Sequence, residues 1–303
     1  MDNLAASKLR TQLAEPDSII FCPGVQDGLS ARVCLQQGFK NLYMAGAGTA
    51  MSLLGVPDLG LTTADDMVRN ASMIAPLDRT APLIADADTG FGGPAMTERY
   101  ILAGVAGLHI EDQVTTKRCG HLLGKELVDT STFTSRVRGA AAARSRLNSD
   151  IVIIARTDSL QSLGFEEAVL RLQAAVQADA DVAFLEGIQD KEQMKQIVEA
   201  MKPTPCLLNM VAGGVTPLIN SAEARHLGFR IVIWPCFAMT AAYLAYQQAA
   251  KELQTTGAIA EHWGGPDGAG IVGGVRESFE LCGLTEFTAF DKEMGGKTFT
   301  DGV

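Results

Sequence analysis

Short apolar runs rich in β-branched residues alternate along the chain with longer segments whose apolar residues have helical spacing. The short runs predict eight strands, over residues 18–22, 41–45, 82–87, 107–111, 151–156, 182–186, 205–210 and 230–234. The longer segments predict helices near residues 27–37, 63–76, 95–105, 134–147, 165–178, 190–201, 221–227 and 239–255. Because parallel strands need crossover helices between them, this alternation predicts an α/β fold, a (β/α)8 TIM-type barrel.

The last part of the chain departs from the alternation. Residues 261–275 are rich in glycine and predict a linker, and a further short helix is expected around Glu277–Leu281. We therefore expect residues 1–260 to form the α/β barrel and residues 261–303 to form the linker and a C-terminal helical extension of the same domain. Helices beyond the eighth crossover have no barrel face to cover, so another subunit is expected to bury their apolar side.

Composition narrows the function classes. The chain has 303 residues, of which 47% are hydrophobic, and a formal net charge of −10, which argues against a nucleic-acid partner. It contains no apolar run long enough to span a membrane and no N-terminal targeting segment, which predicts a soluble protein with no membrane partner. Six scattered cysteines without metal-knuckle spacing fit a reducing compartment, so we expect a cytoplasmic location.

Carboxylates follow the third and fourth predicted strands. Asp86 and Asp88 end the third, and Glu111 ends the fourth. The C-terminal ends of barrel strands open on one face, so these acids should converge there, with Asp58 completing an outer shell. Oxygen ligands of this kind suit Mg²⁺, with Mn²⁺ as an alternative. The competing interpretation is that these acids cap helices or pair with lysines.

Cys119 lies in a basic loop between Lys117-Arg118 and Gly120-His121. Neighbouring positive charge lowers the pKa of a thiol, which favours a general acid/base or a nucleophile, and glycine allows the loop to close as a lid. Taken alone, a cysteine in such a loop is more often an inert surface residue.

Other polar residues also end predicted strands. The guanidinium of Arg156 suits a carboxylate, and the consecutive N–H groups of the turn at Gly46 form an anion nest. The alternative for Arg156 is a structural ion pair with Glu186 or Asp158. His109, alone on an apolar strand, is expected to be a hydrogen-bonded residue inside the barrel.

Six segments carry a resemblance to a known family. They are Tyr43-Met-Ala-Gly-Ala-Gly48, Pro57-Asp-Leu-Gly60, Asp86-Ala-Asp-Thr-Gly-Phe-Gly92, residues 107–113, Lys117-Arg-Cys-Gly-His121 and Ala155-Arg-Thr-Asp158. Together they resemble the isocitrate lyase/phosphoenolpyruvate mutase superfamily over residues 18–250. The Cys-Gly-His loop is specific to the lyase branch, and the pattern is most similar to fungal 2,3-dimethylmalate lyase and oxaloacetate hydrolase.

The resemblance implies roles for these residues. Asp86 would bind Mg²⁺, and Asp58, Asp88 and Glu111 would support the ion through water. The expected catalytic residues are Tyr43, which would take the proton from a substrate 2-hydroxyl, Cys119, which would protonate the carbanion left when C2–C3 breaks, and Arg156. The expected substrate-binding residues are Ala45, Gly46, Ala47, Gly120, His121, Glu186, Asn209 and Thr216. The family also implies a homotetramer, a dimer of dimers, in which partners exchange the last helix.

Departures from the family pattern bear on the substrate. Thr240 stands where 2-methylisocitrate lyases have an arginine for a third carboxylate, and Pro235 stands where oxaloacetate hydrolases typically have serine. We therefore expect a carbon–carbon lyase that cleaves a dicarboxylate such as 2,3-dimethylmalate to pyruvate and a carboxylic acid. The alternatives are an oxaloacetate hydrolase, a 2-methylisocitrate lyase, and a non-catalytic metabolite-binding protein. Ala212 replaces a usual glutamate and Ala45 a usual hydroxyl residue, which indicates either a pocket for a different side group or reduced activity, as in the last alternative.

Overall fold

The computed structural model describes residues 4–16, 18–258 and 275–297. The chain divides into two compact units, one ending at Met239 and the other beginning at Thr240. The predicted glycine-rich linker lies outside the described residues, apart from its last position. The predicted domain boundary at residue 260 stays a prediction.

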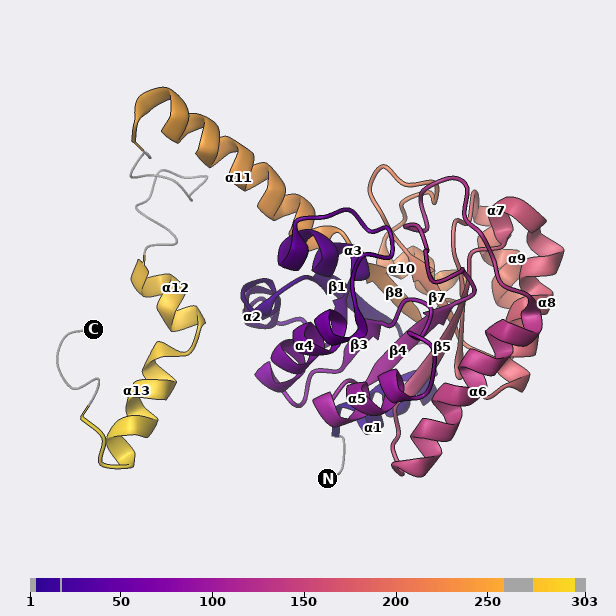
Figure 1. The fold of residues 1–303 in the computed structure, drawn as a ribbon, viewed down its shortest axis with the longest axis horizontal. Coiled ribbons are helices and arrows are strands. Elements are labelled where there is room, and N and C mark those ends of the chain that lie inside the picture. The colour runs from indigo at the N-terminus through magenta and orange to yellow at the C-terminus, as the bar shows by residue number, and fades with distance from the viewer. Residues whose placement is uncertain (1–3, 17, 259–274, 298–303) are drawn as a thin grey trace. The chain divides into compact units, whose positions relative to one another are not determined.

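Eight parallel strands close into a barrel in chain order, with β1 paired to β8 (Figure 1). This confirms the predicted fold, and every strand begins and ends close to its predicted bounds. The strands are β1 (Ile20–Val25), β2 (Leu42–Met44), β3 (Leu83–Asp86), β4 (Gly107–Glu111), β5 (Val152–Thr157), β6 (Val182–Leu185), β7 (Cys206–Asn209) and β8 (Ile231–Trp234).

Helices lie between the strands and cover the outside of the barrel (Figure 1). Side-chain caps explain several of their starts; for example, Asp129 accepts from the backbone N–H of Thr132 at the beginning of α6. The helices of the first unit are α1 (Leu4–Ala14), α2 (Gly28–Gln36), α3 (Gly46–Thr49), α4 (Ala64–Ile74), α5 (Ala95–Ala103), α6 (Thr130–Arg146), α7 (Leu160–Leu163), α8 (Phe165–Gln177), α9 (Lys191–Met201) and α10 (Ser221–His226).

Strand alternation sorts the core into two layers. Ile20 and Cys22 of β1, like Val152 and Ile154 of β5, are fully or almost fully buried in the inner cluster. Ile153, between them in sequence, belongs instead to the cluster packed beneath the helices. The inner cluster also includes Ala5, Ala6 and Leu9 of α1, a helix that the sequence pattern did not predict. The barrel interior is therefore filled with side chains, as in other barrels of this size.

The second unit consists of helical segments. It contains most of α11 (Phe237–Thr256), α12 (Val275–Leu281) and α13 (Leu284–Glu293). The sequence pattern predicted α11 and a short helix near α12 but not α13. Within the described ranges, every helix is too short or too polar to span a bilayer.

Candidate active site

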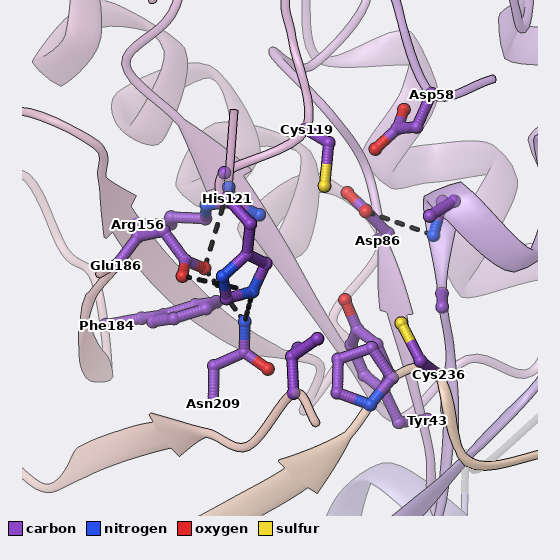
Figure 2. A pocket seen from close by; sticks show the side chains of 16 residues that line it. Tyr43, Asp58, Asp86, Cys119, His121, Arg156, Phe184, Glu186, Asn209 and Cys236 are labelled. Atoms are coloured by element: carbon purple, nitrogen blue, oxygen red, sulfur yellow. Dashed lines mark hydrogen bonds and ion pairs between the residues drawn. The ribbon is translucent and has the colours of Figure 1, made fainter. Parts of the chain in front are cut away.

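A cavity opens where the strands end. Its walls come from the ends of β2, β3, β5, β6, β7 and β8, from Asp58 and from the loop that carries Cys119 (Figure 2). The lining residues are Tyr43, Ala45, Gly46, Ala47, Asp58, Asp86, Cys119, Gly120, His121, Arg156, Phe184, Glu186, Asn209, Val211, Pro235 and Cys236.

Most of the residues predicted for the site therefore line one cavity. Asp88 and Glu111 do not line it, although both are buried and bonded to groups that do. Thr216 is also buried but is not among the lining residues.

The geometry of the turn after β3 places Asp86 and Asp88 together. Asp88 has a left-handed backbone, with φ of 47°, and its N–H donates to Asp86 Oδ1 at 2.8 Å. The other oxygen of Asp86 accepts from the backbone N–H of Gly46 at 3.1 Å. A Cβ at Gly46 would lie 2.5 Å from Asp86 Oδ2, so only glycine fits here without displacing the carboxylate.

Lys117 neutralises part of this acidic cluster. Its Nζ lies 2.6 Å from Asp58 Oδ1 and 2.6 Å from Asp88 Oδ1, and its side chain is 2% exposed. The interpretation of these acids as lysine partners is therefore correct for Asp58 and Asp88. It does not hold for Asp86, whose carboxylate pairs with no lysine of the described chain and lines the cavity.

Burial and neighbouring charges have opposite effects on the pKa values of Asp86 and Asp88. For Asp86, burial acts to raise the pKa, but His109, Lys117 and Arg156 outweigh it and bring the pKa to about 2. For Asp88, burial together with Asp86 and Asp58 outweighs Lys117 and raises the pKa to about 6. Asp86 is consequently the more acidic carboxylate of the two.

The carboxylates around Asp86 suit a hard cation such as Mg²⁺ that keeps most of its water ligands. Among the described residues, no group of three or more His, Cys, Asp or Glu side chains forms a ready-made metal cage. Mg²⁺ usually binds through one or two carboxylates with water in the other positions, which one cavity-facing Asp86 satisfies. Glu111 Oε2 is buried and forms an ion pair of 3.4 Å with Arg156.

Tyr43 and His109 form a buried pair next to Asp86. Tyr43 Oη lies 2.7 Å from His109 Nε2, and this nitrogen lies 3.6 Å from Asp86 Oδ1. Burial lowers the pKa of His109 to about 4, so the imidazole is neutral and can accept from the phenol. Burial and Asp86 raise the pKa of Tyr43 well above 10. The expectation that His109 is a hydrogen-bonded interior residue is confirmed.

Arg156 is surrounded by three carboxylates. Its Nε and Nη2 donate to Asp158 at 2.9 and 3.0 Å, and ion pairs of 3.4 and 3.6 Å reach Glu111 and Glu186. Its guanidinium carbon lies 5.3 Å from the centre of the Phe184 ring. The structural ion pairs considered for Arg156 are thus present, and its side chain lines the cavity as well.

Cys119 faces the cavity near Asp86, from a loop held against the Asp58 segment (Figure 2). Its backbone N–H donates to the Asp58 carbonyl at 3.1 Å. Burial raises the pKa of the Cys119 thiol, so the expectation that basic neighbours lower it was wrong. The reason is that Lys117 points to Asp58 and Asp88, so burial dominates. Cys119 is therefore a protonated thiol, suited to donate a proton.

A chain of polar groups closes the opposite wall. Asn209 Nδ2 donates to Glu186 Oε2 at 3.0 Å, and His121 Nε2 lies 3.7 Å from Glu186 Oε1 (Figure 2). A Cβ on Gly120 would clash with Arg156 and Glu186, and one on Gly214 would lie 2.7 Å from His121. These glycines let the loop approach the strand ends closely.

Sequence reasoning missed the apolar part of the cavity. Phe184, Val211 and Cys236 line it, but none was predicted there. Phe184 could have been found, because it stands two residues before Glu186 and alternation places both on the same side of the strand. Val211 and Cys236 lie beyond the ends of β7 and β8, where the alternation of side chains along a strand no longer predicts which way a side chain points.

Comparison with known proteins identifies relatives over almost the whole chain. The phosphoenolpyruvate phosphomutase family model matches residues 9–254. The 2,3-dimethylmalate lyase of Eubacterium barkeri is 39% identical over 261 residues, covering 84% of this chain and 89% of that protein. A crystal structure of 2,3-dimethylmalate lyase has 50% identity and a TM-score of 0.93, covering 99% of this chain and 98% of that one.

Two other structures extend the comparison. Oxaloacetate acetylhydrolase in complex with the inhibitor 3,3-difluorooxalacetate has 49% identity and a TM-score of 0.92, covering 98% of this chain and 99% of that one. A more distant structure, phosphonopyruvate hydrolase with oxalate and Mg²⁺, has 26% identity and a TM-score of 0.80, covering 96% and 99%. The expected fungal origin of the nearest branch is not supported. With its barrel, its Cys-Gly-His loop and these relatives, the chain belongs to the phosphoenolpyruvate phosphomutase family of the isocitrate lyase/PEP mutase superfamily.

Proposed function

We propose that this carbon–carbon lyase uses Mg²⁺ to cleave an alkyl-substituted malate, such as 2,3-dimethylmalate, to pyruvate and a carboxylic acid. The observation that carries the proposal is the convergence of Asp86, Cys119 and Arg156 on one cavity. These residues supply a metal ligand, a proton donor and a carboxylate partner. The similarity to 2,3-dimethylmalate lyase over the whole chain supports the same substrate class.

The α-keto acid half of the substrate would bind between the strand ends. Arg156 would face its carboxylate, with the Asn209 amide and the N–H groups at Ala45 and Ala47 nearby, whereas the Gly46 N–H already donates to Asp86. Glu186, Gly120 and His121 would complete this part of the site. Thr216 is buried but does not line the cavity, so it would not contact the substrate directly.

Asp86 would hold Mg²⁺ directly, while Asp58, Asp88 and Glu111 would hold its water ligands. When bound, the ion supplies positive charge for the oxygen that becomes the keto group. The low pKa of Asp86 supports this assignment.

Two groups of the cavity would transfer protons in the reaction, the Tyr43–His109 pair and the Cys119 thiol. Tyr43 would take the proton of the 2-hydroxyl as its own proton passes to His109 Nε2, which lies 2.7 Å away. The C2–C3 bonding electrons would move to C3 while C2 becomes a ketone. The Cys119 thiol would then donate its proton to C3 to give the carboxylic acid. The raised thiol pKa keeps this proton available.

The cavity wall favours an alkyl-substituted dicarboxylate. Phe184, Val211 and Pro235 present apolar surface to the space beside the acids. Arg156 is the single Lys or Arg among the described lining residues, so each further substrate carboxylate depends on the metal ion or on uncharged donors, and a tricarboxylate adds one more such group than a dicarboxylate. Together with the absence of the family arginine at Thr240, this disfavours a 2-methylisocitrate.

An oxaloacetate hydrolase is the second candidate, because the oxaloacetate acetylhydrolase structure is almost equally similar. That reaction needs a hydrated keto group. Tyr43 is the only hydroxyl side chain among the described lining residues, and Pro235 occupies the position where serine is expected. The cavity therefore favours the lyase.

The proposed assembly is a homotetramer, a dimer of dimers with exchanged C-terminal helices. Exposed apolar side chains occur in both compact units. In the first unit, Leu29, Val33 and Met73 are 41–52% exposed on α2 and α4. In the second, Tyr246, Phe287 and Phe290 are 63–69% exposed. Burial of such surfaces is what a stable subunit interface requires.

A substrate panel with product identification tests the proposal. The protein is incubated with Mg²⁺ and 2,3-dimethylmalate, malate, 2-methylisocitrate or oxaloacetate, and pyruvate is followed by coupling to lactate dehydrogenase. Pyruvate from 2,3-dimethylmalate, lost with EDTA and restored by Mg²⁺, is expected. A Cys119→Ser preparation controls for contaminating lyases. Oxalate and acetate from oxaloacetate, with no cleavage of the malates, would establish the hydrolase instead.

A further inference from the structure

The loop that carries Cys119 is a flap with a fixed neck. Val114 N–H donates to the Glu126 carbonyl, and Val128 N–H donates to the Asp112 carbonyl, each at 2.9 Å. Residues between these bonds reach over the cavity, where Cys119 and Gly120 form part of its wall. Because these bonds hold the neck, only the tip around Cys119 and Gly120 is free to move. Its contacts with the barrel therefore control whether the flap is closed.

Lys125 makes one of the contacts that join this tip to the strand ends. Its Nζ donates to the Gly120 carbonyl at 2.7 Å and to Asp158 Oδ1 at 3.0 Å. The Lys125 side chain is 3% exposed, although it does not line the cavity. A buried ammonium thus links the residue next to Cys119 with a carboxylate on the barrel.

Asp158 is a rigid partner for this ammonium. Its side chain is fully buried, and its backbone N–H donates to Asp112 Oδ1 at 2.9 Å. Asp112 Oδ2 in turn accepts from Arg171 Nη1 of α8 at 3.1 Å. The network fixes the position of Asp158 independently of the flap.

The same oxygen of Asp158 also orients Arg156. Oδ1 accepts from Arg156 Nη2 and from Lys125 Nζ, each at 3.0 Å, while Oδ2 accepts from Arg156 Nε. Arg156 alone cannot balance Asp158, Glu111 and Glu186, which all lie within 3.6 Å of its nitrogens. Lys125, beside the fixed neck, supplies a second positive charge to this cluster.

We propose that Lys125 is a positioning residue that couples closure of the Cys119 flap to alignment of Arg156 through Asp158. Closing the flap places the thiol over the cavity and, in the same movement, sets the hydrogen bonds of the arginine. Opening it would take the Gly120 carbonyl away from the buried Lys125 ammonium, which opposes opening. The inference rests on the proposed function for the roles of Cys119 and Arg156, but flap closure itself does not depend on turnover.

Lys125→Met removes the charge and keeps most of the side-chain volume. In the absence of substrate, we expect alkylation of Cys119 by iodoacetamide, resolved by peptide mass spectrometry, to accelerate at least tenfold. Alkylation of the exposed Cys282 should not change. We expect kcat on the alkylmalate to fall at least tenfold. The matched control is Lys191→Met, which removes an exposed lysine paired with Glu223 and should alter neither readout.

Lys125→Ala, tested with added amines, distinguishes loss of the ammonium group from general damage to the fold. Propylammonium, which can occupy the vacated space, should restore both Cys119 protection and turnover, whereas the bulkier tetramethylammonium should restore neither. Unchanged Cys119 protection in both variants, or a loss of turnover that propylammonium does not reverse, would overturn the proposal. If Cys119 becomes reactive in the variants but the wild-type protein cleaves no malate, the role of Lys125 in flap closure is supported and the substrate assignment is wrong.

Discussion

Gly46→Ala perturbs the candidate metal ligand without touching its charge. The new Cβ would lie 2.5 Å from Asp86 Oδ2 and 3.1 Å from its Cγ. Ordinary van der Waals contact requires a retreat of the carboxylate by roughly 1 Å. The hydrogen bond from Gly46 N–H to the same oxygen, now 3.1 Å, would lengthen at the same time.

The expected result is weaker Mg²⁺ binding with a largely intact fold. Loss of a partner that orients a metal ligand typically lowers metal affinity by about 10- to 100-fold, equivalent to about 1.4–2.7 kcal/mol. Binding of Mn²⁺, measured by electron paramagnetic resonance in competition with Mg²⁺, gives the affinity directly. Circular dichroism reports whether the barrel is retained.

Gly139→Ala is the matched control. A Cβ at Gly139, within α6, would meet only Pro94 at 3.8 Å, which is an ordinary contact. This variant should keep its metal affinity and gain stability, because alanine is favoured over glycine inside a helix. If Gly46→Ala binds Mg²⁺ as tightly as the wild type, Asp86 is not the direct ligand.

Three other perturbations test the site and its surroundings. Cys119→Ser should abolish cleavage while leaving Mn²⁺ affinity within about twofold, since the thiol donates a proton and binds no metal; retained turnover would remove it from the reaction. Because burial raises the pKa of Cys119, the thiolate accumulates only as pH rises above 9, so alkylation of the wild-type thiol should keep accelerating through pH 9; a plateau below pH 8 would contradict this. Asp112→Asn leaves Arg171 without its buried counterion and should lower the free energy of unfolding by about 3–5 kcal/mol in urea denaturation, whereas a loss below about 1 kcal/mol would show that the network adapts.

The barrel could be predicted from the sequence because each strand is a short apolar run with a clear end. The run Gly107–Glu111 was located without error, since it changes abruptly from apolar residues to acids. By contrast, α1 was missed because only Ala5, Ala6 and Leu9 mark its buried face. The first turns of α6, from Thr130, were missed because Thr and Ser carry little helical signal without the Asp129 cap in view.

The site was predictable as far as strand ends determine it. Asp86, Arg156 and Asn209 lie at or next to strand ends, so their convergence follows from the topology alone. The ion pairs of Lys117 and Lys125 depend on how the flap folds back, which local sequence does not encode. For the same reason the sequence suggested a lowered pKa for Cys119 where burial raises it.

The departures at Ala45 and Ala212 bear on whether the chain turns over substrate at all. Ala45 lines the cavity, whereas Ala212 does not. If the chain were a non-catalytic binding protein, restoring threonine at 45 and glutamate at 212 should create activity that the parent lacks. We expect instead that the parent protein is active. The homotetramer, the helix exchange and the cytoplasmic location stay predictions.

Cleavage of 2,3-dimethylmalate in D₂O, followed by NMR spectroscopy, tests the proposed reaction most directly. With Mg²⁺ present, we predict pyruvate together with propionate that carries one deuterium at C2, because the Cys119 proton exchanges with solvent before it is donated. An unchanged spectrum with the folded, metal-loaded protein, or exchange at C3 without breakage of the C2–C3 bond, would contradict this reaction.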